Sequence, residues 1–458
     1  MIRLTTAEIA RITGGTLTGD GALVVEGVLS DSRLVGPGDL FAAVRGEFHD
    51  GGDFVPAAFD SGAVAALVDQ TLTVSGTTIV VEDVLRALAS LARYVRDVVD
   101  PLVVGITGSV GKTSTKDFLR SIGGRKFSTV ATERSLNAEI GVPLTLLNLS
   151  PKTELLVCEM GARGVGQIAE LCGYVRPQVG IVTNVDVTHL EMFGSREAIA
   201  RSKGELVEAL PEGGTAVLNA DDGLVGPMAA RTRAEVLTFG LSSEASVRAS
   251  RVSVDELGRA TFRLAYEGEG SWASLPFSGR HQVVNALAAA GAGLALGLSL
   301  DECARGLEEA SGSPWRMEVS ISRGIVIIND AYNAGPRSTA SALETAAEMV
   351  REGGGLTAVL GHMAELGEIE RDEHLRIGRM AAEIAGRVIV VGERAAPIAQ
   401  GARLSGAAEV IQVQLPDEAL GHLEDLGPGD VVLFKGSRIA ALELLAERAL
   451  EMIERVPQ

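Results

Sequence analysis

The sequence has little of several residue types that mark particular classes of protein. It contains three cysteines among 458 residues, and aromatic residues make up only 4%. An odd number of cysteines cannot all pair within one chain, and their spacing fits no zinc site. We therefore expect Cys158, Cys172 and Cys303 to be buried thiols in a reducing compartment, which argues against a disulfide-stabilised scaffold.

Basic residues are also in short supply. Lys and Arg number 41 against 60 Asp and Glu, a formal net charge of −19. A general nucleic-acid binder needs a basic surface, so we expect no nucleic-acid partner. An anionic small molecule would have to be bound by a local concentration of Lys, Arg and backbone N–H groups.

Long apolar runs are absent. The first eight residues lack the basic-then-apolar order of a signal peptide. The most apolar stretch, 286–300, is shorter than the ~20 residues of a membrane-spanning helix. We expect a cytoplasmic protein without stable membrane insertion, and a monomer.

What the sequence does have is a hydrophobic fraction of 46%, enough for a substantial core. Short apolar runs alternate with Ala- and Leu-rich helical patterns, which predicts α/β units on largely parallel sheets. We divide the chain into a small α/β N-terminal domain (1–99), a central domain with a mostly parallel sheet (100–313) and a Rossmann-like, doubly wound C-terminal domain (314–458).

The most specific motif is a glycine-rich loop between the apolar run 102–106 and a helical pattern. In this setting backbone N–H groups and a helix N-terminus face phosphate oxygens. Lys112 can reach the β and γ phosphates, and the Thr113 hydroxyl can bind Mg²⁺. The loop lacks the first glycine of the strict P-loop pattern, but strand, loop and helix follow in the right order. It comprises Thr107, Gly108, Ser109, Val110, Gly111, Lys112, Thr113 and Ser114.

Two further polar residues follow apolar runs of the central domain. Glu159 ends the run 155–158, and His189 follows the run 181–184 after a short loop. Because ligands collect at the carboxyl edge of open α/β sheets, we expect both near the phosphate loop. Lys203 lies in a helical stretch, and from its surroundings it is predicted to be an ordinary surface lysine.

Together these motifs resemble the Mur ligases, which form amide bonds in peptidoglycan precursors. The resemblance spans nearly the whole chain in order. The features nearest the glycine-rich loop are Glu159-Met-Gly161, Asn184 with His189, Lys203-Gly-Glu205, Asn219-Ala-Asp-Asp222, Gly279-Arg-His281 with Asn285, and Arg316-Met-Glu318. A second set favours the branch that adds D-alanyl-D-alanine to a UDP-N-acetylmuramoyl-tripeptide: Asp31-Ser-Arg33 with Gly46, Asn137 with Ile140-Gly-Val-Pro143, Tyr332-Asn-Ala334, Met363-Ala-Glu-Leu-Gly367 with His374, and Lys435-Gly-Ser-Arg438.

The resemblance implies an ATP-dependent, ADP-forming ligase with two Mg²⁺ ions and small-molecule substrates. The first domain would bind the UDP substrate, the second ATP and the third the amine. The tripeptide carboxylate would take the γ phosphate of ATP, and the dipeptide amine would then attack the acyl phosphate. Lys112 and the metal ions would offset the negative charge of the first step.

The resemblance also implies roles for single residues. The catalytic residues would be Lys112, His189 and Lys203, with Lys203 carbamylated, and the metal ligands Thr113, Glu159, His189 and Lys203. Besides the loop, ATP would contact His281, Asn285, Arg316, Asp330 and Asn333. The UDP substrate would contact Asp31, Ser32, Arg33 and Gly46. The peptide or dipeptide would contact Asn137, Thr183, Asn184, Lys435 and Arg438.

Without the resemblance, several of these residues have ordinary structural readings. Asp31 with Arg33 could form a capped loop, Asp330 could cap a strand end, and 435–438 could be a plain turn. Four positions depart from the family pattern and bear on hinge geometry and substrate contacts: Ala138, Trp315, Gly335 and His362. The alternatives are a ligase for a shorter muramyl peptide or for folate, a non-catalytic nucleotide-binding subunit derived from a ligase, and a P-loop NTPase with a mechanical or regulatory role.

Overall fold

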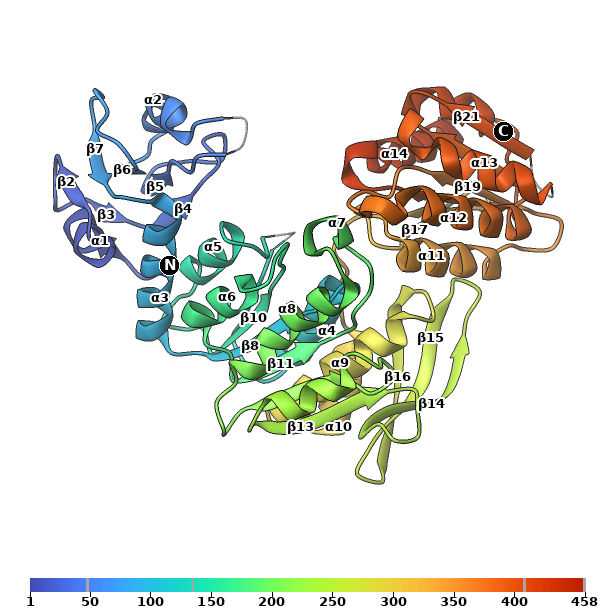
Figure 1. Cartoon of the computed structure of the whole chain (residues 1–458), viewed down its shortest axis with the longest axis horizontal. Helices are drawn as coiled ribbons and strands as arrows, with labels where there is room; N and C mark the ends of the chain where they lie inside the picture. The colour runs from blue at the N-terminus through green and yellow to red at the C-terminus, as the bar shows by residue number, and fades with distance from the viewer. Residues whose placement is uncertain (47–48, 134–135, 407–408, 456–458) are drawn as a thin grey trace.

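The computed structural model describes residues 1–46, 49–133, 136–406 and 409–455. Three large sheets occupy successive stretches of the chain, and Figure 1 shows them along an arc from blue through green to red. In the described part of the chain, no helix is long and apolar enough to cross a membrane. Cys158, Cys172 and Cys303 are buried and unpaired, as expected.

The first stretch folds on a five-stranded sheet in the order β2-β7-β6-β5-β4. Two short strands lie close together within 24–29, because Val24–Val25 pairs with β1 while Gly27–Leu29 joins the sheet. The elements are β1 (Leu4–Thr5), α1 (Thr6–Thr13), β2 (Thr16–Thr18), β3 (Val24–Val25), β4 (Gly27–Leu29), β5 (Asp39–Ala42), α2 (Val55–Asp60), β6 (Ala65–Val68), β7 (Thr77–Val80) and α3 (Val84–Val99).

Helix α3 joins the first stretch to the second. Asp83 caps its first turn by accepting from the Arg86 backbone N–H, and Pro101 follows its left-handed C-cap, Asp100. Its apolar stripe, including Leu88 and Leu91, is fully buried in one core cluster with residues of both stretches. The burial of this stripe fixes the first sheet against the second.

The central sheet has nine strands, in the order β16-β15-β14-β13-β12-β11-β8-β10-β9. It is parallel from β9 to β14, and β14, β15 and β16 form an antiparallel extension. The strands are β8 (Leu102–Thr107), β9 (Thr129–Ala131), β10 (Leu155–Glu159), β11 (Val179–Val182), β12 (Thr215–Asn219), β13 (Glu235–Gly240), β14 (Val247–Val254), β15 (Arg259–Tyr266) and β16 (Glu269–Ser278).

Helices cover both faces of this sheet, and the central strand β8 shows why. Val103 packs in the cluster that holds α3, α5 and α6, whereas Val104 and Ile106 pack in the cluster that holds α4, α9 and α10. Successive side chains of a strand point to opposite faces, so a strand buried on both faces is apolar throughout. The helices are α4 (Lys112–Gly124), α5 (Gly141–Leu147), α6 (Gln167–Val175), α7 (Leu190–Phe193), α8 (Arg196–Glu208), α9 (Gln282–Ala295) and α10 (Leu300–Glu308).

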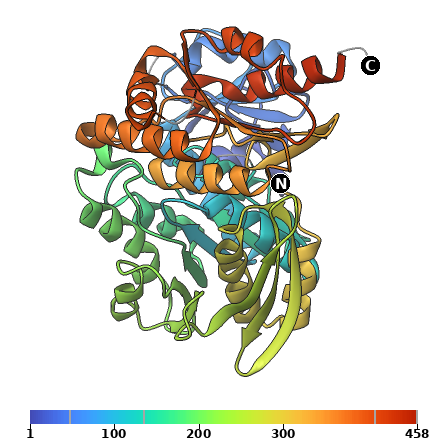
Figure 2. The ribbon, with the colours of Figure 1, turned by 90° about the vertical axis from the view of Figure 1, so that its right-hand side faces the viewer.

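The third sheet has six strands in the order β17-β18-β22-β19-β20-β21. Only β17 is antiparallel. Figure 2 shows its helices α11 and α12 facing the central region. The elements are β17 (Glu318–Ser322), β18 (Ile325–Asn329), α11 (Pro336–Glu348), β19 (Leu356–Leu360), α12 (Glu370–Ile384), β20 (Arg387–Val391), α13 (Ala396–Ser405), β21 (Glu409–Val413), β22 (Val431–Lys435) and α14 (Leu442–Arg455).

Candidate active site

The glycine-rich loop connects the end of β8 to the start of α4, at the carboxyl edge of the central sheet. Gly108 and Gly111 have φ angles of 145° and 86°. A Cβ at Gly108 would lie 1.9 Å from Thr183 Oγ1, and one at Gly111 would lie 2.2 Å from Asn285 Oδ1. Both positions therefore require glycine, for backbone conformation and for space.

The loop opens on a cavity of about 500 Å³ between the central and third regions. Lys112 lines it, and its Nζ donates to Gly108 O at 2.7 Å and to Ser109 O at 3.3 Å. Burial lowers the pKa of Lys112, and the Glu159 carboxylate opposes this effect. The Lys112 ammonium group thus lies against the loop, where a bound anion would contact it.

Glu159 ends β10 and is 1% exposed. Its Oε2 accepts from Thr113 Oγ1 at 2.9 Å, and its Oε1 accepts from Asn137 Nδ2 at 2.7 Å. A carboxylate and a hydroxyl that already touch are suitable oxygen ligands for a hard divalent cation. We call the loop 107–114 together with Glu159 the phosphate-loop wall.

His189 and Lys203 line the same cavity from α7 and α8. Lys203 is 2% exposed, so its prediction as a surface lysine was wrong. Burial and the charge of Lys112 lower the pKa of Lys203 to about 7, whereas Glu205 acts in the opposite direction. Within residues 1–46, 49–133, 136–406 and 409–455, no three His, Cys, Asp or Glu side chains converge as a ready metal site.

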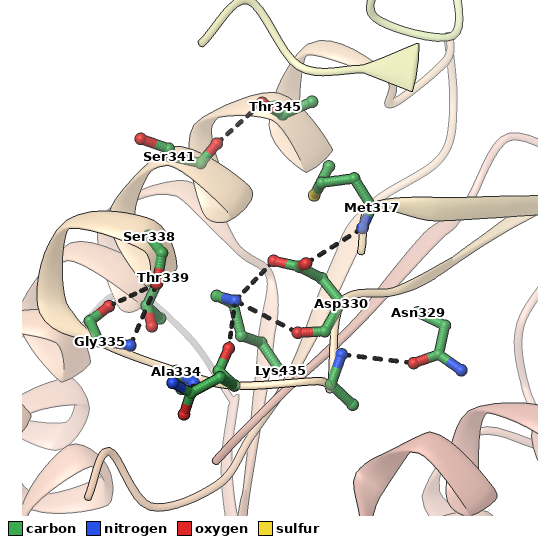
Figure 3. A network of polar contacts seen from close by, with 12 residues as sticks. Met317, Asn329, Asp330, Ala334, Gly335, Ser338, Thr339, Ser341, Thr345 and Lys435 are labelled. Atoms are coloured by element: carbon green, nitrogen blue, oxygen red, sulfur yellow. Dashed lines mark hydrogen bonds and ion pairs between the residues drawn. The ribbon is translucent and has the colours of Figure 1, made fainter. Parts of the chain in front are cut away.

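Figure 3 shows the opposite side of the cavity, where β18 and β22 end side by side. Lys435 Nζ lies 2.6 Å from Asp330 Oδ2 and donates to Asp330 O and Asn333 O at 3.2 and 2.9 Å. Asp330 Oδ1 accepts from the Met317 backbone N–H at 3.0 Å. We call Asp330, Asn333 and Lys435 the third-region wall.

Arg316 reaches the cavity from the linker between the two walls. Its guanidinium carbon lies 4.0 Å from the centre of the Tyr332 ring, within range of a cation–π contact. His281 precedes α9 and Asn285 lies in its first turn, beside Gly111. Burial lowers the pKa of His281 to about 4, so its imidazole is neutral near pH 7.

The structure brings most of the predicted site residues together. Those lining the cavity are Ser109, Val110, Gly111, Lys112, Thr113, Ser114, Asn137, Glu159, Asn184, His189, Lys203, His281, Asn285, Arg316, Asp330, Asn333 and Lys435. Thr107, Gly108, Thr183 and Arg438 are not part of this lining. Thr183 Oγ1 donates to Val110 O at 2.7 Å, which holds the loop from behind.

Asn184 has a structural contact that its predicted role does not include. Its Oδ1 accepts from the Val110 backbone N–H at 2.9 Å, and its Nδ2 donates to Val110 O at 2.8 Å. Both polar groups of the side chain thus bind the loop backbone. A peptide contact for Asn184 stays a prediction.

The residues predicted to bind the UDP substrate lie in the first region, outside the cavity lining. Arg33 forms a salt bridge with Asp31 at 2.6 Å, and its hydrogen bond holds the pKa of Asp31 down to about 2. The Gly46 backbone N–H donates to His49 O at 2.9 Å. The role of Asp31, Ser32, Arg33 and Gly46 stays a prediction.

Glu365 contacts a residue that lines the cavity, and the sequence analysis quoted it within a motif but gave it no role. Its carboxylate contacts His189 Nδ1, which lowers the pKa of Glu365. Its carbonyl accepts from the Glu191 backbone N–H at 3.3 Å. The contact joins the third region to α7, and no local pattern indicates it because 176 residues separate the partners.

Comparison with known proteins agrees with this geometry. The Mur ligase middle domain matches residues 106–293, the Mur ligase, glutamate ligase domain matches 315–438, and the Mur ligase family, catalytic domain matches 24–96. A UDP-N-acetylmuramoyl-tripeptide–D-alanyl-D-alanine ligase of Mycobacterium tuberculosis is 38% identical, with 98% of each chain covered. The Escherichia coli protein of that name is 34% identical over 98% of this chain and 99% of its own.

The chain belongs to the Mur ligase family. Solved structures extend the similarity to three dimensions. MurF from Acinetobacter baumannii has a TM-score of 0.88 at 31% identity, covering 98% of this chain and 99% of its own. MurF ligase from Thermotoga maritima, in complex with ADP, has a TM-score of 0.81 at 30% identity, covering 94% and 97%. The predicted family, α/β fold and ligase activity are confirmed.

Proposed function

We propose that this Mur ligase joins D-alanyl-D-alanine to a UDP-N-acetylmuramoyl-tripeptide with ATP, in the cytoplasm and as a monomer. The observation that carries the proposal is the single cavity that Lys112, Glu159 and Lys203 share with Arg316 and Asp330. Full-length relatives at 34% and 38% identity bear the corresponding name, which supports this choice of substrates.

The proposed reaction has two steps. An oxygen of the tripeptide carboxylate attacks the γ phosphorus of ATP, and the bond to the β-phosphate oxygen breaks to give ADP. The dipeptide amine then attacks the acyl carbon, and the tetrahedral intermediate releases phosphate. Two anions must approach in the first step, so a cation at the loop has its largest effect there.

Lys112 supplies that cation within the protein. Among the described residues, its ammonium group contacts only carbonyl oxygens of its own loop, at 2.7 and 3.3 Å, so it can exchange them for phosphate oxygens without breaking an ion pair there. When substrates fill the cavity between the two regions, bulk water is kept away from the acyl phosphate. Arg316 would contact the nucleotide from the linker side.

Magnesium fits one part of the site. Thr113 Oγ1 and Glu159 Oε2, 2.9 Å apart, would hold one ion beside the phosphates. Bound magnesium would neutralise charge on the triphosphate oxygens. His189 and Lys203 would serve a second ion once Lys203 is carbamylated, and a pKa of about 7 supports this because only the neutral amine adds carbon dioxide.

The decisive experiment is phosphate release from ATP with UDP-N-acetylmuramoyl-tripeptide while only the amine is varied. We expect turnover with D-alanyl-D-alanine and at most traces with single amino acids, including glutamate. Turnover with one amino acid on a shorter muramyl peptide would instead identify another ligase of the family. No turnover with any of these substrates would favour a non-catalytic, nucleotide-binding subunit.

A further inference from the structure

A buried ion pair on the phosphate-loop helix is not used by the proposed reaction. Lys116 and Asp117 on α4 are each 2% exposed, and Lys116 Nζ lies 2.8 Å from Asp117 Oδ1. The other oxygen, Asp117 Oδ2, accepts from the backbone N–H of Ser313 at 2.9 Å and from its Oγ at 2.7 Å. Ser313 belongs to the linker that leads into the third region.

The linker is held again two and four residues after Ser313. The Trp315 carbonyl accepts from the Tyr332 backbone N–H at 3.2 Å, and the Met317 backbone N–H donates to Asp330 Oδ1 at 3.0 Å. Arg316 lies between these two bonds and stacks on Tyr332. One carboxylate of the central region and one of the third region thus fix the linker on either side of Arg316.

The backbone around Arg316 is strained. Trp315 and Met317, which flank it, have φ angles of 60° and 51°, in the left-handed region that favours glycine. Such a conformation persists only where the surrounding contacts impose it. A cavity of about 340 Å³ borders the linker at residues 312–314 and 316–319, whereas the Met317 side chain is buried in the core of the third region. The polar contacts at Ser313 and at the Met317 backbone therefore act together with this packing to hold the linker.

We infer that Asp117 and Ser313 are positioning residues: they anchor the linker to the phosphate-loop helix and thereby place Arg316 in the cavity opposite Lys112. Because Lys112 begins the helix that carries Asp117, the anchor ties Arg316 to the phosphate loop itself. Its removal should weaken nucleotide binding without loss of the fold. The inference rests on the proposed binding of a nucleotide in this cavity.

The test measures ADP affinity with magnesium for the full-length protein. Ser313→Ala removes a hydroxyl that donates to Asp117 and accepts from Lys116 Nζ at 3.5 Å, and it leaves the backbone bond to Asp117, so we expect it to fold. ADP should bind about three- to tenfold more weakly, and the unfolding temperature should change little. Asp117→Asn should have a larger effect, but it also leaves Lys116 buried without its partner, so Ser313→Ala decides.

A matched control separates this anchor from general helix packing. Arg125, the C-cap of the same helix, donates to Glu309 at 2.7 Å, and Glu309 is the C-cap of α10. This pair joins α4 to the segment before the linker, at the end remote from the phosphate loop. Glu309→Gln should leave ADP affinity unchanged.

A double-mutant comparison tests whether Ser313 acts through Arg316. If it does, Ser313→Ala should add little to the loss already caused by Arg316→Ala. The inference would be overturned if Ser313→Ala bound ADP as tightly as the wild type. It would also be overturned if the loss of ADP affinity in the double variant equalled the product of the two single losses. Failure of the wild-type protein to bind ADP would instead contradict the proposed function.

Discussion

The two walls of the cavity differ in how they use their charged groups. On the phosphate-loop wall, the Lys112 ammonium group donates to carbonyl oxygens of its own loop, and the Glu159 carboxylate accepts from two neutral side chains. On the third-region wall, Lys435 and Asp330 neutralise each other at 2.6 Å. The charged groups of the phosphate-loop wall remain available to a ligand, whereas those of the third-region wall stabilise the protein itself.

This comparison suggests a division of labour. The phosphate-loop wall supplies electrostatic stabilisation to the reaction, and the third-region wall supplies a rigid surface that closes the site. Substitutions on the first wall should therefore reduce activity far more than stability. Substitutions on the second should reduce stability and, through it, closure.

The largest effect is expected for Lys112→Ala. The Lys112 ammonium group would stabilise the negative charge on the phosphate as it is transferred. Without this group, turnover should fall by at least about 10³-fold. The fold should be kept, since the substitution also removes a charge whose burial is unfavourable. Phosphate release and thermal unfolding check this, and near-normal turnover in a folded variant would contradict it.

Lys435→Met should show the opposite pattern. It leaves Asp330 buried without its cation, and breaking such a pair costs about 3 kcal/mol of unfolding free energy. Urea unfolding measures the loss. Asp330→Asn is a matched partner variant, because it keeps the shape of the side chain while removing the charge. If Lys435→Met is as stable as the wild type but inactive, the comparison between the walls fails, and Lys435 contacts substrate as the resemblance implies.

The two walls also differ in how well sequence could predict them. The phosphate loop is a local motif, so strand, loop and helix were all expected where β8 and α4 lie. The Asp330–Lys435 pair joins residues 105 apart, and the family resemblance assigned the two residues to different substrates. Lys203 was misjudged for the same reason: the charges and packing that bury it come from other elements.

Prediction of the fold from the sequence has a similar limit. Strands buried on both faces, such as β8 and β10, are continuous apolar runs, and the runs 102–106 and 155–158 were recognised in the sequence. Strands β14, β15 and β16 alternate buried and exposed side chains along much of their length, so a search for apolar runs passes over them. The domain boundaries expected at 99 and 313 stay predictions, as do the individual roles of the site residues.

A smaller effect is expected for Arg438→Ala, at the rim beside the third-region wall. The guanidinium is exposed and lies 5.6 Å from the Trp315 ring and 5.9 Å from the Tyr332 ring. If it meets the carboxylate of the dipeptide, its loss should raise KM for the amine about tenfold, the equivalent of one charge-assisted hydrogen bond. The KM for ATP should not change. If the KM for the amine and the KM for ATP rose equally, Arg438 would instead act by stacking near Arg316.

The smallest effect concerns His281, which lies near both walls. Burial lowers the pKa of His281 to about 4, whereas in the unfolded chain it is near 6.5. Between these values the unfolded state binds more protons, so stability falls as pH drops from about 6.5 towards 4. His281→Gln lacks this proton uptake, so its unfolding temperature should decline less over that range, by about 2 °C. Identical pH profiles for the two proteins would show that the His281 imidazole titrates as freely in the folded chain as in the unfolded one, and the site between the walls would then be open to water at that point.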